Sequence, residues 1–283
     1  MYKIIKNKRL NINTVMLEIE APRVACKAEP GQFIILRVNE TGERTPFTVA
    51  DTNPEKNTVT IIFQEIGKTT KMLGEMKVGE FILDFVGPLG KPSELSGYKK
   101  VAVVAGGLGA AIAYPQAKKL KKLGTEVHFI GGFRNKELII LENEARQSSD
   151  LAIIATDDGS NGVKGFVTNV LKQLLDEGNQ YDVVIAIGPL PMMKFVSALT
   201  KEYEVKTIVS MCPIMIDGTG MCGGCRLTVG NEVKFACVDG PEFDGHKVEF
   251  DEAIRRQAYY KDKENISLEK HNCRMEGMHN VKH

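Results

Sequence analysis

The stretch Asp217-Gly-Thr-Gly-Met-Cys222-Gly-Gly-Cys225 is the densest cluster of candidate metal ligands in the chain, and Cys237 follows it. Two cysteines separated by two residues can bind one metal centre, and the glycines between them let the backbone fold tightly around it. Residues 226–236 contain two β-prone runs on either side of Gly230-Asn231, which is a typical hairpin turn. The stretch therefore predicts a small metal site built on loops and closed by a hairpin.

The spacing of these residues points to one kind of metal centre. The pattern Asp-x4-Cys-x2-Cys-x11-Cys resembles the plant-type signature for a [2Fe–2S] cluster, with the first thiolate replaced by an aspartate. Cys212 could replace the aspartate as the fourth ligand, although its spacing fits poorly. The predicted ligands are one carboxylate and three thiolates: Asp217, Cys222, Cys225 and Cys237.

Two other interpretations of the cysteines compete with this one. A structural zinc site would typically have a second close pair of ligands, whereas Cys237 stands alone. Free cysteines buried in a core are common. That alternative does not explain why four glycines crowd between Asp217 and Cys225. An iron–sulfur cluster accounts for both the spacing and the glycines.

Length and composition limit the function classes. The chain has 283 residues, enough for two or three domains, and a net charge of +1. This charge gives no electrostatic footprint for nucleic acid or an anionic membrane. No apolar run reaches transmembrane length, and the N-terminus lacks the apolar core of a signal peptide. Six cysteines, mostly in one cluster, favour a reducing compartment. We expect a cytoplasmic protein that binds neither nucleic acid nor membrane.

Residues 1–96 have the pattern of an antiparallel β-barrel. Short β-prone runs at 15–20, 33–38, 58–63 and 80–85 are separated by Gly and Pro turns. Two polar stretches in this region could bind a dinucleotide. Arg44 could pair with phosphate, Pro46 removes a backbone donor, Phe47 offers an aromatic face and Thr48 a hydroxyl.

The second polar stretch precedes a helical segment, where a pyrophosphate would be well placed. It supplies backbone N–H groups, hydroxyls and a cation from Gly67, Lys68, Thr69 and Thr70. Each stretch alone is more often a solvated turn. Their occurrence together on one predicted barrel favours a cofactor site.

Residues 97–208 alternate apolar strands with helices, which predicts a parallel sheet covered on both faces. We expect helices from the first glycine turn to about residue 123, over 136–147 and over 168–175. The turn with Gly106, Gly107 and Gly109 would let a phosphate approach the start of a helix, although it is not a complete G-x-G-x-x-G motif. Arg134 is an ordinary surface residue or a phosphate partner. Further candidates lie where later strands end: Asp157, Asp158, Gly188 and Met192.

Taken together, these motifs resemble the ferredoxin–NADP reductase-like superfamily. More narrowly, the chain is similar to the small (alpha) subunit of NADH-dependent ferredoxin:NADP oxidoreductase, which is also called a sulfide dehydrogenase subunit. It is less similar to the electron-transfer subunit of dihydroorotate dehydrogenase, in which a cysteine replaces the aspartate. The motifs that carry the resemblance are Arg44-Thr-Pro-Phe-Thr, Gly67-Lys-Thr-Thr, Gly87-Pro-Leu-Gly, the Gly106 turn, Thr156-Asp-Asp-Gly-Ser, Gly188-Pro-Leu-Pro-Met-Met and the Asp217–Cys225 stretch.

The resemblance implies three cofactor sites in three regions. Residues 1–96 would bind FAD through the Arg44–Thr48 and Gly67–Thr70 stretches. Residues 97–208 would bind NAD(H), or NADP(H), over the Gly106–Gly109 turn, with Asp157 and Gly188 lining the site. Residues 209–283 would hold the [2Fe–2S] cluster and a C-terminal tail.

The implied function is electron transfer between a nicotinamide dinucleotide and a partner through FAD and the cluster. The resemblance implies a larger partner subunit with its own FAD and [4Fe–4S] clusters, in a complex that bifurcates electrons with ferredoxin. No catalytic acid or base is expected, because the protein's task is to orient its cofactors. Two alternatives remain: the electron-transfer subunit of a dihydroorotate dehydrogenase, and a non-enzymatic redox sensor. After an amphipathic helix over 250–260, we expect a mobile or partner-bound tail from residue 261.

Overall fold

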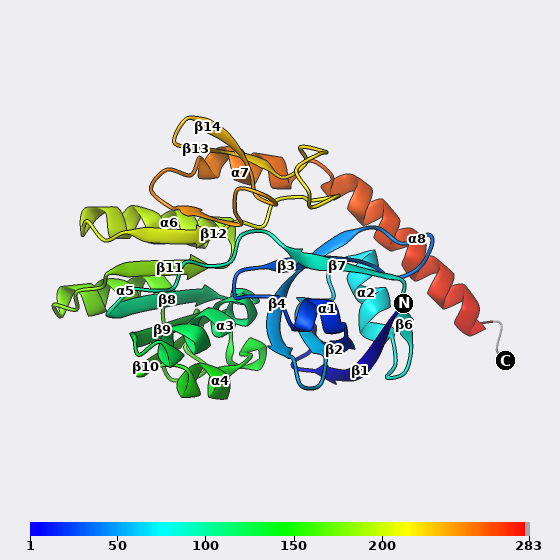
Figure 1. Cartoon of the computed structure of the whole chain (residues 1–283), viewed down its shortest axis with the longest axis horizontal. Coiled ribbons are helices and arrows are strands. Elements are labelled where there is room, and N and C mark those ends of the chain that lie inside the picture. Colours follow the sequence, from blue (N-terminus) through cyan, green and yellow to red (C-terminus); the bar gives the residue numbers. More distant parts are fainter. Residues whose placement is uncertain (281–283) are drawn as a thin grey trace.

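The computed structural model describes residues 1–280, with side chains described as far as residue 273. A β-barrel and an α/β domain lie side by side, and the C-terminal segment contacts both of them (Figure 1). This arrangement confirms the predicted fold class. The last three residues of the predicted C-terminal segment lie outside the described residues.

The barrel is a seven-stranded antiparallel sheet in the order β6-β1-β2-β5-β4-β3-β7. The two end strands, β6 and β7, are consecutive in the chain and separated only by Leu83, so the sheet curves until its two edges are joined covalently. Short helices α1 (Pro22–Ala25) and α2 (Lys68–Glu75) cover its ends. The strands are β1 (Tyr2–Arg9), β2 (Thr14–Glu20), β3 (Phe33–Arg37), β4 (Thr45–Asn53), β5 (Thr58–Gln64), β6 (Phe81–Ile82) and β7 (Asp84–Leu89).

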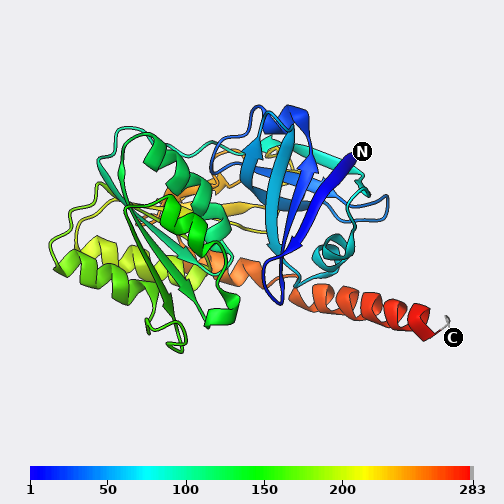
Figure 2. The ribbon, with the colours of Figure 1, turned by 90° about the horizontal axis from the view of Figure 1, so that it is seen from below.

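The α/β domain has a six-stranded sheet in the order β10-β9-β8-β11-β12-β15. Its first five strands are parallel, as predicted, whereas β15 is antiparallel. Helices α3 and α4 pack on one face of the sheet, and α5 and α6 pack on the other (Figure 2). The strands are β8 (Lys100–Gly106), β9 (Glu126–Phe133), β10 (Leu151–Thr156), β11 (Val183–Ile187), β12 (Thr207–Ser210) and β15 (Glu242–Asp244); the helices are α3 (Gly109–Lys122), α4 (Glu142–Gln147), α5 (Val167–Asp176) and α6 (Leu190–Glu202).

One predicted helix of this domain is wrong in extent. The sequence predicts a continuous helix over 136–147, but the structure has a 3₁₀ turn, η1 (Lys136–Leu138), before α4 begins at Glu142. Leu141 has a φ of 55°, in the left-handed region, so a helix cannot run through it. The Asn135 side chain accepts a hydrogen bond from the Leu138 backbone N–H at 3.2 Å and stabilises the separate turn.

The C-terminal segment is joined to the α/β sheet. The predicted boundary after residue 208 falls inside β12, and β15 returns to pair with β12. Between these strands, β13 (Arg226–Val229) and β14 (Glu232–Phe235) form the predicted hairpin. Gly230 and Asn231 both have positive φ angles, 59° and 67°, as a tight hairpin turn requires.

Two helices complete the described chain. Helix α7 (Phe250–Gln257) confirms the predicted amphipathic helix. Where the sequence predicts a mobile or partner-bound tail, α8 (Lys261–Asn280) is a helix that runs past α2 and then projects beyond the barrel (Figure 2). Residues 261–270 are rich in Lys and Glu, which favour a solvated helix. Lys71 Nζ on α2 donates a hydrogen bond to Asn272 Oδ1 of α8 at 3.4 Å.

Gly109, the first residue of α3, lets the start of this helix lie close to the end of β11, and a substitution there tests how tightly the two elements pack. A β-carbon at Gly109 would lie 2.2 Å from the carbonyl oxygen of Ile187, at the end of β11. We expect Gly109→Ala to lower the free energy of unfolding by about 1–3 kcal/mol, because backbone must move to admit the methyl group. Thermal unfolding measures this. Gly67→Ala, whose added carbon would meet nothing nearer than 4.0 Å, is the control, and equal melting temperatures would contradict the packing.

Candidate functional site

Two glycine-rich turns meet at the carboxyl edge of the α/β sheet. A β-carbon on Gly106 would lie 2.4 Å from Met192 Sδ, and one on Gly188 would lie 3.0 Å from the Gly106 backbone nitrogen. The structure therefore brings together Gly106, Gly109, Gly188 and Met192, as the sequence predicts. Gly107, with a φ of 54°, faces open space, since nothing lies within 4 Å of its β-carbon position. This edge is where open parallel sheets bind ligands.

The two predicted aspartates at the end of β10 differ in their surroundings. Asp157 is exposed, and its backbone N–H donates to the Phe133 carbonyl oxygen at 2.9 Å. Asp158 is directed to its own loop, where its carboxylate accepts the Ser160 backbone N–H at 2.9 Å. Hydrogen bonds with Ser160 lower the pKa of Asp158. Asp158 thus stabilises the loop, and a contact of Asp157 with a nucleotide remains a prediction.

The barrel stretch from Arg44 to Thr48 leads into β4, which begins at Thr45. Pro46 and Thr48 are partly exposed, whereas the Phe47 ring is buried in the barrel core. This ring packs edge-on against Phe63 at 5.5 Å between ring centroids. Side chains alternate along a strand, and this one faces inward, so a contact of Phe47 with a cofactor remains a prediction.

Arg44 joins the barrel stretch to the C-terminal segment. The Arg44 side chain is exposed, and its Nε donates a hydrogen bond to the Ile216 carbonyl oxygen at 3.3 Å. Ile216 immediately precedes Asp217, the first predicted cluster ligand. Two stretches that are 172 residues apart in the sequence therefore meet, a contact that the sequence alone did not indicate.

The start of helix α2 is capped by one of its own side chains. Thr70 Oγ1 accepts the backbone N–H groups of Gly67 at 3.0 Å and Ile66 at 3.1 Å. The Thr70 hydroxyl is thus engaged in capping the helix, and Thr69 is buried. The features left for an anion are the helix N-terminus and the Lys68 side chain, which is partly exposed. A phosphate at this helix start remains a prediction.

The loop that carries the predicted cluster ligands is shaped by glycines and by Asp217. Gly218, Gly220 and Gly223 all have positive φ angles. The Asp217 carboxylate accepts the backbone N–H groups of Thr219 at 2.8 Å and Cys222 at 2.7 Å. These hydrogen bonds lower the pKa of Asp217, so it carries a negative charge at neutral pH.

The cysteines of this loop occupy different environments. Cys222 is exposed, and its Sγ accepts the Gly224 backbone N–H at 3.4 Å. Cys225 and Cys237 are buried. Burial, the Cys225 thiol and the charge of Asp217 raise the pKa of Cys237 to about 12. Two thiols and a carboxylate thus share one environment that disfavours a further negative charge.

Comparison with known proteins identifies the family. A model of the iron–sulfur cluster binding domain of dihydroorotate dehydrogenase B matches residues 213–249. The chain is 45% identical over 268 residues to a Thermotoga maritima protein named dihydroorotate dehydrogenase B (NAD(+)), electron transfer subunit homolog, covering 95% of this chain and 94% of the relative. It is 34% identical over 251 residues to the corresponding electron transfer subunit of Shouchella clausii, covering 85% and 94%.

The chain belongs to the dihydroorotate dehydrogenase B electron transfer subunit family. Within this family, the predicted kinship with NADH-dependent ferredoxin:NADP oxidoreductase is confirmed. A solved structure from a study of flavin-based electron bifurcation, described as that of the NADH-dependent reduced ferredoxin–NADP oxidoreductase, matches with a TM-score of 0.91 and 42% identity, covering 95% of this chain and 97% of that chain. The chain is thus an oxidoreductase subunit with an iron–sulfur binding domain.

The residues of this domain fit a cluster in their chemistry. Without a nearby positive charge, the thiolate forms of Cys225 and Cys237 are unfavourable. Iron would supply this charge and would bind the two side chains as thiolates. All four predicted ligands lie within the matched residues, whereas Cys212 lies just before them. Among the described residues, no three His, Cys, Asp or Glu side chains are gathered as a metal site. The structure brings Cys225 and Cys237 together, and the full ligand set remains a prediction.

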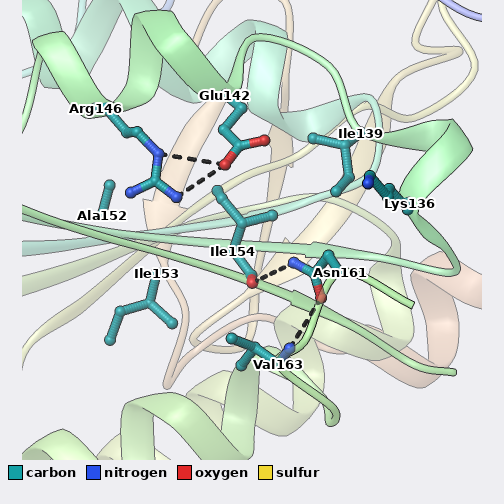
Figure 3. Close-up of a pocket in the computed structure, with 9 residues that line it drawn as sticks. All are labelled: Lys136, Ile139, Glu142, Arg146, Ala152, Ile153, Ile154, Asn161 and Val163. Carbon is teal, nitrogen blue, oxygen red and sulfur yellow. Dashed lines mark hydrogen bonds and ion pairs between the residues drawn. The ribbon is translucent and has the colours of Figure 1, made fainter. Parts of the chain in front are cut away.

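A separate pocket of about 510 Å³ lies at the outer edge of the sheet, between α4, η1 and β10 (Figure 3). Arg146 pairs with Glu142 at one side of it, at 2.8 Å, and Lys136 stands at another. None of the predicted site residues lines this pocket. Within the part of the chain that the structure describes, no helix has the length and apolar character needed to cross a bilayer.

Changing Asp217 tests its role as a ligand. Asp217→Cys should keep the cluster and shift its midpoint potential by an amount on the order of tens of millivolts, because a carboxylate oxygen is replaced by a thiolate. Redox titration followed by visible spectroscopy measures the shift. Asp217→Asn is the matched variant: Thr219 and Cys222 donate to different carboxylate oxygens, so the single amide oxygen of asparagine keeps one of these two hydrogen bonds and carries no negative charge. An unchanged spectrum and potential in the cysteine variant would show that Asp217 only shapes the loop.

Proposed function

We propose that this chain passes electrons between NAD(H) and a partner subunit through FAD and a [2Fe–2S] cluster, within an NADH-dependent ferredoxin:NADP oxidoreductase. The observation that carries the proposal is the meeting of three motif-bearing regions. Arg44 of the barrel contacts the cluster loop at Ile216, and α3, which begins at the glycine turn, is tied to the barrel by Lys118 Nζ and Asp51 Oδ2 at 2.8 Å. The 42% identity to a chain of that oxidoreductase supports it.

The residues of the chain would hold and orient the cofactors. The open side of Gly107 admits a dinucleotide phosphate over the start of α3, while Lys68 and the N-terminus of α2 attract the phosphates of FAD. Bound FAD accepts a two-electron hydride and releases electrons singly, and the cluster carries single electrons. The protein's contribution is then a fixed separation between three sites.

No side chain is assigned as a catalytic acid or base. The histidines near the α/β core have structural hydrogen bonds: His128 Nδ1 lies 2.8 Å from the Tyr181 hydroxyl, and His246 Nε2 lies 3.0 Å from Thr200 Oγ1. Burial lowers the pKa of His128 and keeps it neutral at pH 7. Hydride and electron transfer need no acid–base group from the protein in this proposal, because the cofactors carry the chemistry.

The partner in this proposal is a larger subunit with its own FAD and [4Fe–4S] clusters, and ferredoxin reacts through the complex. The proposal includes a cytoplasmic location. The six cysteines form no disulfides, which is typical of proteins in a reducing compartment. The second candidate is an electron-transfer subunit of a dihydroorotate dehydrogenase, favoured by the names of the relatives. Isolation of the native complex discriminates them, because the large subunit that copurifies is either the iron–sulfur flavoprotein or the dehydrogenase.

The first test is the visible spectrum of the purified chain before and after anaerobic addition of NADH or NADPH. We expect flavin and [2Fe–2S] absorption that bleaches with NADH. Absorption that neither nucleotide changes would contradict electron transfer and would favour a redox sensor. Bleaching by NADPH in place of NADH would leave the proposed electron path unchanged but would show that the nucleotide is NADP(H) and not NAD(H).

The glycine turn offers a second test. Gly107→Val should raise the KM for NADH about tenfold or more, because a side chain at this left-handed position fills the space above the turn. Chemical reduction of the flavin by dithionite should be unchanged. Gly124→Val is the control: Gly124 has a φ of 84° and open space around it, but it lies between α3 and β9 at the opposite edge of the sheet. Equal KM values for both variants would place the nucleotide elsewhere.

A further inference from the structure

Glu242, on β15, is at the centre of a hydrogen-bonded cluster that the proposed electron path does not use. Its Oε1 accepts Ser93 Oγ at 2.6 Å and Gln116 Nε2 at 2.6 Å. Ser93 lies between the barrel and the α/β domain, Gln116 lies on α3, and Glu242 follows the cluster loop. One carboxylate oxygen thus joins the three regions to which the three cofactors are assigned.

The barrel also packs directly against this cluster. A β-carbon on Gly31, in the turn before β3, would lie 2.2 Å from Ser93 Oγ and 3.1 Å from Glu242 Oε1. The Ser93 backbone N–H donates to the Pro30 carbonyl oxygen at 2.9 Å. Any movement of Glu242 or Ser93 is therefore transmitted to the barrel through atoms in contact.

Gln116 connects the cluster to the glycine turn. It is fully buried, two helical turns after Gly109, on the helix whose first residue packs on the end of β11. The same helix reaches the barrel through two ion pairs, Lys118 with Asp51 at 2.8 Å and Lys119 with Glu29 at 3.8 Å. Both pairs are between a third and a little over half exposed, so each contributes little. The hydrogen bonds to Glu242 are more shielded from water and hold α3 in place more strongly.

We propose that Glu242 is a positioning residue for hydride transfer: through Ser93 and Gln116 it sets the separation between the glycine turn and the barrel without touching either cofactor. This inference rests on the proposed function. A displacement of about 1 Å at a distance from the reacting atoms is enough to slow a transfer by about 100-fold. Glu242 therefore acts on the rate through geometry alone.

The protonation of Glu242 is consistent with this role. Burial raises its pKa above the usual value of 4.5, and the nearby carboxylate of Glu94 adds to the increase, while Ser93 and Gln116 oppose it. Gln116 Oε1 is buried without a hydrogen-bond partner. With the Gln116 amide turned over, this oxygen would face Glu242, and a protonated carboxyl would donate to it.

The test uses the full chain loaded with FAD and its cluster. In Glu242→Leu, we expect the rate constant for flavin reduction at saturating NADH to fall about tenfold or more, while reduction by dithionite is unchanged. Glu242→Gln should restore the rate to within about threefold, because its amide oxygen still accepts both hydrogen bonds. Lys119→Gln is the matched control on the same helix and should stay within about twofold, since its ion pair is exposed.

Hydrogen exchange gives a second readout that needs no turnover. Backbone amides of α3 near Gln116 and of β15 should exchange about tenfold faster in Glu242→Leu and at the normal rate in Lys119→Gln. If Glu242→Leu does not fold, Gln116→Leu removes one hydrogen bond from the other side and should slow the same step about threefold. A wild-type rate together with unchanged exchange in the leucine variant would overturn the inference. Failure of both NADH and NADPH to reduce the wild-type flavin would instead contradict the proposed function, and exchange would still decide the role of Glu242.

The pH dependence of stability provides an independent prediction. Because the pKa of Glu242 is higher in the folded than in the unfolded chain, the folded state binds this proton more tightly. The stabilisation is complete below about pH 4.5 and is lost as the pH rises through the folded-state pKa. Urea unfolding as a function of pH should show this loss in the wild type, and Glu242→Gln should remove it. Identical slopes in the two proteins would contradict a buried, titrating Glu242.

Discussion

Helix α3 is the element on which the relative placement of the two domains depends. Its first residue packs against the Ile187 carbonyl at the end of β11, and its middle turns face β4 of the barrel. The first contact is possible only because Gly109 has no side chain. The second is held mainly by buried Gln116, whose Nε2 donates to Glu242 Oε1 at 2.6 Å, because the Lys118–Asp51 ion pair is partly exposed and contributes little. Helix α3 therefore determines how the glycine turn is oriented toward the barrel.

The C-terminal segment adds the third site to this pair by returning to both domains. It leaves the α/β sheet after β12, passes Arg44 of the barrel at Ile216, and re-enters the sheet as β15. Gly218 of the cluster loop packs closely against Ile35 and Leu89 of the barrel. An added β-carbon would lie 2.6 Å from Ile35 Cδ1, so this close contact holds the loop on the barrel. The cluster loop is therefore held by both domains, as electron transfer between fixed centres requires.

The sequence predicted the fold class and most of the strands because their apolar periods are strong. It did not predict that Thr45–Asn53 is a strand, and a proline within a paired strand is unusual. The structure explains the exception: Pro46 pairs only with Ile35 of β3, in a part of β4 where β5 is not yet alongside. The predicted helix over 136–147 is interrupted at Leu141, which has a left-handed backbone conformation. A leucine gives no indication of this conformation in the sequence.

The candidate site shows the same division between local and long-range information. Spacing found the cluster loop and the glycine turns, because their chemistry lies in short stretches. It did not show that the Phe47 ring packs in the barrel core or that Thr70 caps its own helix, because both contacts depend on the fold. Gln116 and Glu242 escaped notice because each is an ordinary polar residue until the fold places them 2.6 Å apart.

The central claim is that one chain connects a nucleotide, a flavin and a cluster. Freeze-quench electron paramagnetic resonance of the full chain, loaded with about one FAD and two irons, tests it most directly after mixing with NADH. The account predicts that the signal of the reduced [2Fe–2S] cluster appears with the loss of flavin absorption. Loss of flavin absorption with a cluster that stays oxidised, although dithionite reduces it, would contradict the connection.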